Sequence, residues 1–130
     1  RIFDSRTGAL IHNFLAYPGF FGGVYVAVGD VDGDGTKDIV TGAGKDGGPH
    51  VRVFRGGSYE PIRDFLAYGQ GYFDGVTVAA ADVNGDQRAD IITGSARISS
   101  HVQVFDGVTT ELIRSFLAYE PAYDRGVYVA

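Results

Sequence analysis

The sequence contains no cysteine, so disulfide bonds, thiolate metal sites and a cysteine nucleophile are all excluded. It also lacks an apolar run long enough to span a membrane, and no basic segment followed by an apolar one indicates a signal peptide. The absence of cysteine leaves the cellular compartment open. Because the first residue is Arg1 rather than methionine, we expect the chain to be a processed or excised piece whose targeting segment would have been lost.

Positive charge is scarce as well. The 11 Lys and Arg residues are outnumbered by 16 Asp and Glu residues, giving a net charge of −5, which disfavours a nucleic-acid partner. Glycine, in contrast, is abundant, at 20 of 130 residues or about twice its usual share. Together with many β-branched and aromatic residues, this composition predicts one domain of short strands and tight turns.

Two short motifs each occur three times, which indicates an internal repeat of about 51 residues. Phe-Leu-Ala-Tyr begins at Phe14, Phe65 and Phe116, and Val-X-Val-Ala begins at Val24, Val76 and Val127. The repeats divide the single domain 1–130 into a half unit, two full units and the first strand of another unit. These parts are residues 1–23, 24–75, 76–126 and 127–130.

Each full unit is predicted to form four short strands, because β-branched or alternating runs are separated by Gly, Pro, Asp and Asn. The first unit has strands at 24–28, 39–41, 50–54 and 62–67, and the second at 76–80, 91–93, 101–105 and 112–118. No window shows the apolar stripe of a helix. Four antiparallel strands every ~40–50 residues are typical of β-propeller blades. We therefore predict an all-β, partial β-propeller of about two and a half blades, with both repeated motifs packed between blades.

An acidic loop follows the first strand of each full unit. In loop 1 (residues 30–38), carboxylates occupy positions 1, 3, 5 and 9, while Gly33 and Gly35 permit sharp turns. Carboxylates this close repel one another, and a divalent cation removes that repulsion. Ca²⁺ takes six to eight oxygen ligands, which alternate residues of a tight loop can supply. Loop 2 (residues 82–90) repeats the pattern with small changes.

These features together resemble FG-GAP repeats, the blade units of integrin-α-type propellers and of many bacterial secreted and surface proteins. The residues that carry the resemblance are Phe21-Gly22-Gly23-Val24, loop 1, and the stretches 38–44 and 47–54. The resemblance implies a propeller, commonly seven-bladed, with Ca²⁺ bound after the first strand of a blade. The implied ligands in loop 1 are Asp30, Asp32, Asp34, Asp38 and the Thr36 carbonyl. Those in loop 2 are Asp82, Asn84, Asp86, Asp90 and the Arg88 carbonyl.

Loop 2 is expected to bind Ca²⁺ more weakly. Asn84 removes one charge, and Gln87 replaces the glycine at Gly35, where a left-handed backbone would cost about 1 kcal/mol. An EF-hand is excluded, because its glutamate at position 12 is replaced by Thr41 or Thr93 and strands, not helices, flank the loops. The alternative that both loops are Asp- and Gly-rich turns without metal stays open.

Two further patterns are interpreted as structural. Residues 42–47 match a dinucleotide-binding glycine motif, but a strand rather than a helix follows them, so a turn is predicted. His50 and His101 occupy the same repeat position, which favours a structural hydrogen bond over catalysis. No Ser-His-Asp set or free acid pair remains once the loops are set aside, so we expect no enzyme activity.

The sequence therefore predicts a non-catalytic, calcium-binding propeller module for adhesion or for binding a protein or glycan. We expect it outside the cell or at the cell surface, with the periplasm as an alternative location. The alternative functions are a carbohydrate-binding lectin and the non-catalytic part of a polysaccharide-acting enzyme. Two and a half blades leave open strand edges. Either the remaining blades of a larger chain cover them, which we favour, or copies of the chain form a homo-oligomer.

Overall fold

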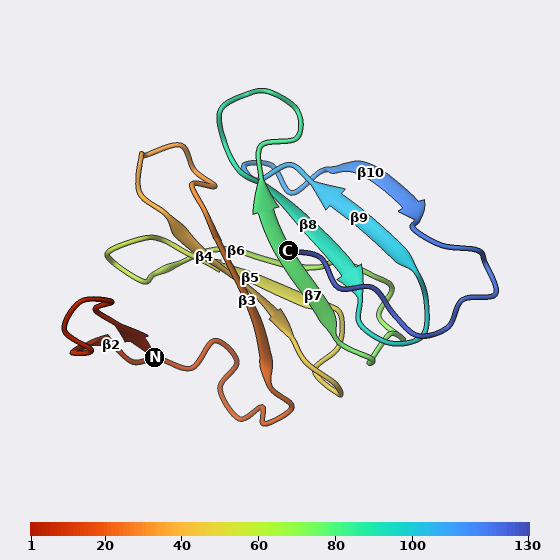
Figure 1. Ribbon diagram of the computed structural model, residues 1–130, viewed down its shortest axis with the longest axis horizontal. Helices are drawn as coiled ribbons and strands as arrows, with labels where there is room; N and C mark the ends of the chain where they lie inside the picture. The colour runs from red at the N-terminus through yellow and green to blue at the C-terminus, as the bar shows by residue number, and fades with distance from the viewer.

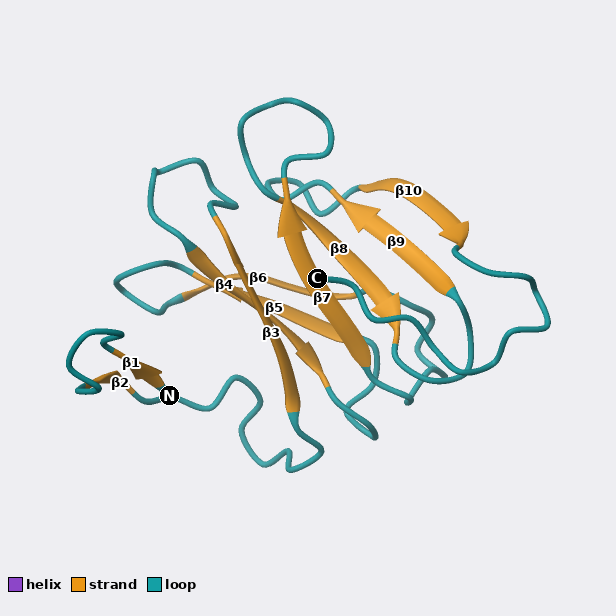
Figure 2. Cartoon of the chain, viewed as in Figure 1, coloured by secondary structure: helices purple, strands orange, loops and turns teal.

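The computed structural model of the protein describes residues 1–130 and contains ten strands and no helix. Consequently, no helical segment that could cross a lipid bilayer is present. The strands form three antiparallel sheets, two of four strands and one of two strands, as Figures 1 and 2 show. The all-β class and the four-stranded blades predicted from the sequence are confirmed.

Blade 1 and blade 2 have the same strand order and the same register. Blade 1 consists of β3 (Val24–Gly29), β4 (Asp38–Ala43), β5 (His50–Phe54) and β6 (Pro61–Leu66). Blade 2 consists of β7 (Val76–Ala81), β8 (Asp90–Ser95), β9 (His101–Phe105) and β10 (Leu112–Leu117). Every predicted strand of the two full units is present, with boundaries that differ by at most two residues.

The hydrophobic core lies between the two blades. Strand β7 packs against β3 and β4, and the fully buried side chains at the centre come from both sheets. They include Val40, Val51, Val53, Val76 and Ile91. Neither sheet could bury these side chains alone, so the core depends on the stacking of the blades.

Glycine near the end of β4 allows the blades to approach closely. A Cβ atom added to Gly42 would lie 2.1 Å from the carbonyl oxygen of Val76 in β7. The same contact recurs one repeat later, where a Cβ on Gly94 would lie 2.7 Å from the Val127 carbonyl oxygen. Each glycine therefore lies within its strand, and its missing side chain leaves space for the backbone of the next unit.

The Phe-Leu-Ala-Tyr motifs connect each unit to the next, as predicted. The Tyr17 hydroxyl group lies 3.0 Å from the carbonyl oxygens of both Thr41 and His50 in blade 1. One repeat later, the Tyr68 hydroxyl donates a hydrogen bond of 2.9 Å to the carbonyl oxygen of His101 in blade 2. Each tyrosine therefore reaches into the sheet that follows it in the chain.

The two ends of the chain form less regular structure. Strands β1 (Ile2–Phe3) and β2 (Leu10–His12) form a small hairpin that lies beside blade 1 (Figure 1). Residues 127–130, predicted to be the first strand of a further blade, are not paired with another strand in this structure and form no strand. The Val127 amide nevertheless donates to the Ser95 carbonyl oxygen at 2.7 Å, which holds the segment against blade 2.

Candidate metal centre

Loop 1 connects β3 to β4, and its aspartates shape its own backbone. The Asp30 carboxylate accepts hydrogen bonds from the amides of Gly33 and Gly35, at 2.8 and 2.9 Å. Both glycines have positive φ angles, 78° and 85°, which a side chain would disfavour. The Asp34 carboxylate accepts a further bond from the Thr36 amide at 2.7 Å. The chain therefore curls around its carboxylates, which brings them to one side of the loop.

Asp38, the first residue of β4, holds loop 1 in place. Its side chain is 0% exposed, yet its carboxylate has partners on both oxygens. Oδ2 accepts a bond from the Val31 amide at 2.9 Å, and Oδ1 accepts one from the Gly56 amide at 2.8 Å. A buried carboxylate needs such partners. Asp38 therefore ties loop 1 to the turn between β5 and β6.

Three of the four predicted carboxylates of loop 1 lie together. One oxygen from each of Asp30, Asp32 and Asp38 lies within 4.8 Å of the others. Opposite ligands of a cation bonded at 2.3–2.6 Å are about 5 Å apart, so this spacing suits a bound cation. Asp34 lies outside the group, and Thr36 is exposed on the loop. Loop 1 thus offers an all-oxygen ligand set with its ligands already close.

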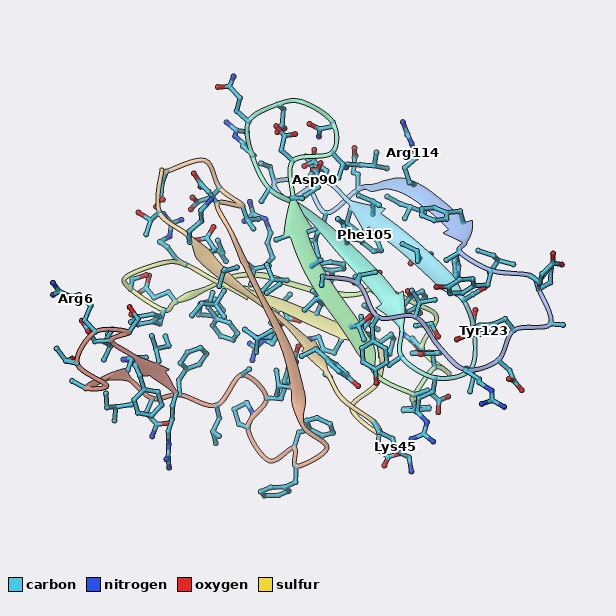
Figure 3. All side chains as sticks on the ribbon, viewed as in Figure 1. Arg6, Lys45, Asp90, Phe105, Arg114 and Tyr123 are labelled. Carbon is cyan, nitrogen blue, oxygen red and sulfur yellow. The ribbon has the colours of Figure 1, made fainter.

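Loop 2 connects β7 to β8 and has nearly the same backbone. The Asp82 carboxylate accepts bonds from the amides of Gly85 and Gln87, at 2.6 and 2.8 Å, and these bonds lower the pKa of Asp82 below its ordinary value. Gln87 has φ of 70°, the left-handed conformation expected from its alignment with Gly35. Asp90 is buried like Asp38 and accepts a bond from the Val83 amide at 3.0 Å. Figure 3 shows Asp90 at the base of loop 2.

The ligand group of loop 2 is less complete. No three carboxylates approach one another there as they do in loop 1. The Asn84 amide nitrogen donates to Asp90 Oδ1 at 3.3 Å, and the Asn84 oxygen accepts a bond from the Asp86 amide at 2.9 Å. The Arg88 amide donates to the Asp86 carboxylate at 2.9 Å. Both polar atoms of the Asn84 side chain are therefore hydrogen-bonded to other residues of loop 2.

Arg55 is a residue of the site that the sequence analysis missed. It begins the turn between β5 and β6, and its Nη2 lies 3.0 Å from Asp32 Oδ2. Its Nη1 lies 3.8 Å from Asp34 Oδ2. The signal was present in the repeat, because Asp106 occupies the equivalent position in the second unit. The charge at this repeat position is positive in blade 1 and negative in blade 2. Since the position lies beside an acidic loop, the reversal indicates that the residue acts differently in the two blades.

The glycine motif at residues 42–47 and the two histidines, His50 and His101, are interpreted as structural from the sequence, and their surroundings agree with this interpretation. Residues 42–47 form the end of β4 and a turn, and no helix follows them. His50 Nε2 contacts the Asp64 carboxylate on the paired strand β6, and His101 Nε2 lies 2.7 Å from the Ser115 hydroxyl on β10. Each histidine thus links the third and fourth strands of its blade.

Comparison with known proteins agrees with this architecture. A family model described as FG-GAP-like repeat matches residues 30–93, which begin at loop 1. The chain is 34% identical over 108 residues to Integrin alpha pat-2 of Caenorhabditis elegans, an alignment covering 80% of this chain and 8% of the integrin. It is 32% identical over 75 residues to Integrin alpha-V of Gallus gallus, covering 56% of this chain and 7% of that protein. The chain therefore spans less than a tenth of these relatives. No solved structure matches it.

Proposed function

The chain belongs to the FG-GAP repeat family of integrin-α-like sequences, and from that premise we propose that it is a calcium-binding, non-catalytic β-propeller module that acts outside the cell in adhesion. The observation that carries the proposal is the group of Asp30, Asp32 and Asp38 oxygens in the first loop of a blade. Those carboxylates would serve as metal ligands, which leaves none of them free as an acid or base.

Calcium is the cation that this ligand set favours. Neither loop contains histidine or cysteine, so the donors are hard oxygens, which suit Ca²⁺ and Mg²⁺ rather than transition metals. Mg²⁺ demands near-ideal octahedral geometry, whereas Ca²⁺ accepts six to eight ligands in variable geometry. In loop 1, Asp34 and the Thr36 carbonyl would complete the set around the three gathered carboxylates. Extracellular modules typically bind Ca²⁺ with a Kd of about 10⁻⁴–10⁻³ M.

The role of the metal would be structural. Loop 1 joins β3 to β4, and Asp38 connects it to the β5–β6 turn, so a cation there links two connections of one blade. The partner would be a protein or a glycan that binds the assembled propeller. A glycan array would separate a lectin from a protein-binding adhesin.

A calcium titration of the purified chain by isothermal calorimetry tests the proposal. We expect two sites, with loop 1 the tighter, because its carboxylates are already gathered and loop 2 lacks one charge. Asp30→Ala should remove the tighter site, and Asp82→Ala, the matched change in loop 2, should remove the weaker one. Equal affinities at the two loops would contradict the ranking. The absence of any calcium binding at millimolar concentration would contradict the proposed function itself.

A further inference from the structure

A positively charged side chain of the protein lies beside the carboxylates of loop 1. The Arg55 guanidinium lies 3.0 Å from Asp32 and 3.8 Å from Asp34, and these are its only carboxylate partners. We propose that Arg55 is an internal counter-cation that competes with the metal at loop 1, so that this loop keeps its shape without metal and binds Ca²⁺ less tightly than its four carboxylates would allow. This inference rests on the proposed function, because it concerns the same site.

The contact with Asp32 is the one that creates competition. Asp32 belongs to the group of three gathered carboxylates, and its side chain is only 13% exposed. Its Oδ2 faces the guanidinium and its Oδ1 accepts a bond from the Asp34 amide at 3.2 Å, so both oxygens have partners. A dication at the group would bind the same carboxylate and repel the guanidinium. Metal binding at loop 1 therefore requires Arg55 to weaken or leave its ion pair.

Backbone hydrogen bonds of the β5–β6 turn hold Arg55 beside loop 1. Within the β5–β6 turn, the Arg55 amide donates to the Glu60 carbonyl oxygen at 2.8 Å, and the neighbouring Gly56 amide donates to Asp38. The turn after the third strand and the loop after the first strand lie at the same end of an antiparallel sheet. The ion pair is thus a consequence of blade topology together with an arginine at this one position.

Blade 2 provides an internal comparison. Asp106 stands where Arg55 does, and its carboxylate accepts bonds from the amides of Val108 and Thr109, at 2.9 and 2.7 Å, within its own turn. None of the loop 2 carboxylates forms an ion pair; the ion pairs of acidic loops are those of Arg55.

Loop 1 contains more carboxylates than loop 2. It has four and loop 2 has three, while Lys37 and Arg88 add one positive charge to the sequence of each loop. Arg55 adds a positive charge beside loop 1, whereas Asp106 adds a negative charge at the equivalent position of blade 2. The blade with the more acidic loop is the one that carries the internal cation, which is the arrangement expected if Arg55 limits the charge that loop 1 must carry without metal.

Calorimetric titration with Ca²⁺ alone tests the inference, in an Asp82→Ala background so that loop 1 is the site observed. Replacing Arg55 with glutamine should raise the affinity of loop 1 about two- to fivefold, the effect expected from losing one partly exposed ion pair. It should also lower the melting temperature of the metal-free protein. Arg55→Lys, which keeps the charge, should have a smaller effect on both quantities.

Arg114→Gln is the matched control. It removes the same charge from an exposed arginine on β10 whose guanidinium donates only to the Ile113 carbonyl oxygen, so calcium affinity should not change. If Asp82→Ala does not fold, as judged by circular dichroism, the same variants are titrated in the two-site protein and the tighter site is compared.

Each outcome decides a different claim. Unchanged or weaker binding after Arg55→Gln, or an equal gain after Arg114→Gln, overturns the inference. If the parent protein binds no calcium but Arg55→Gln does, the inference holds and the proposed function fails. If neither protein binds calcium, both fail.

Discussion

At the scale of single residues, buried tyrosine hydroxyl groups join one unit to the next. Tyr17 and Tyr68 occupy the same repeat position and hydrogen-bond to the blade that follows. Burial raises the pKa of both tyrosines to about 12. Tyr119 holds the third copy of the position and is exposed, and no sheet packs over it in this structure. The same residue type therefore acts as an inter-blade contact only where a neighbouring sheet is present.

These pKa values predict how stability changes at alkaline pH. A tyrosine in the unfolded chain ionises near pH 10, whereas Tyr68 in the folded protein ionises near 12. The contribution to the free energy of unfolding is therefore fully present below about pH 10 and is lost as pH rises from 10 to 12. Urea unfolding at pH 8 and pH 11 should show this loss in the parent protein and a smaller loss in Tyr68→Phe.

Tyr119→Phe is the control for that experiment, because it changes the exposed copy of the position. It should leave the free energy of unfolding at neutral pH unchanged, whereas Tyr68→Phe should lower it by about 1 kcal/mol, the usual net contribution of a hydrogen bond. An equal pH dependence in the parent protein and in Tyr68→Phe would contradict the assignment.

At the scale of elements, the sequence patterns predicted where the strands lie. The strand ends that they missed depend on contacts between elements. Alternating β-branched runs located the strands of both blades to within two residues. The sequence patterns predicted that β4 and β8 end too early, because a glycine such as Gly42 or Gly94 usually weakens or interrupts a strand. Here the absence of a side chain makes room for the next strand, which no local pattern indicates.

The same distinction applies to the metal centre. The spacing of aspartates within each loop indicated the candidate ligands, since those residues are close in the chain. Arg55 is 23 positions after Asp32, and only the strand order β3-β4-β5-β6 brings its turn beside loop 1. The bond from Asn84 to Asp90 likewise depends on side-chain conformation within a folded loop.

The close approach at Gly42 gives a prediction for the packing of blades. Gly42→Ala should lower the free energy of unfolding by about 2–3 kcal/mol, because the new methyl group would overlap the backbone of Val76 and push the blades apart. Chemical denaturation measures this value. Gly69→Ala is the matched control, since a Cβ there meets no atom within 4 Å and should have little effect. Equal effects of the two substitutions would show that the blades are not packed this closely.

At the scale of the whole molecule, each outer face presents the surface that a neighbouring blade covers inside the chain. Val26 on β3 is 61% exposed, whereas Val78, its counterpart on β7, is 4% exposed because blade 1 covers it. On the other face, Phe116 is 50% exposed, while its counterpart Phe65 packs against Phe105 with ring centroids 4.9 Å apart. Because much apolar surface is uncovered on both outer faces, metal sites within each blade should contribute visibly to stability.

Thermal unfolding with saturating calcium and with excess EDTA therefore tests the central claim, that the acidic loops are calcium sites that stabilise the blades. Calcium at about 100 times the Kd of a site should stabilise the folded state by about 2.7 kcal/mol through that site, which raises the melting temperature by about 10 °C for each occupied loop. The double variant Asp30→Ala, Asp82→Ala should lose this dependence on calcium. A melting temperature of the parent protein that is the same with calcium and with EDTA would contradict the account.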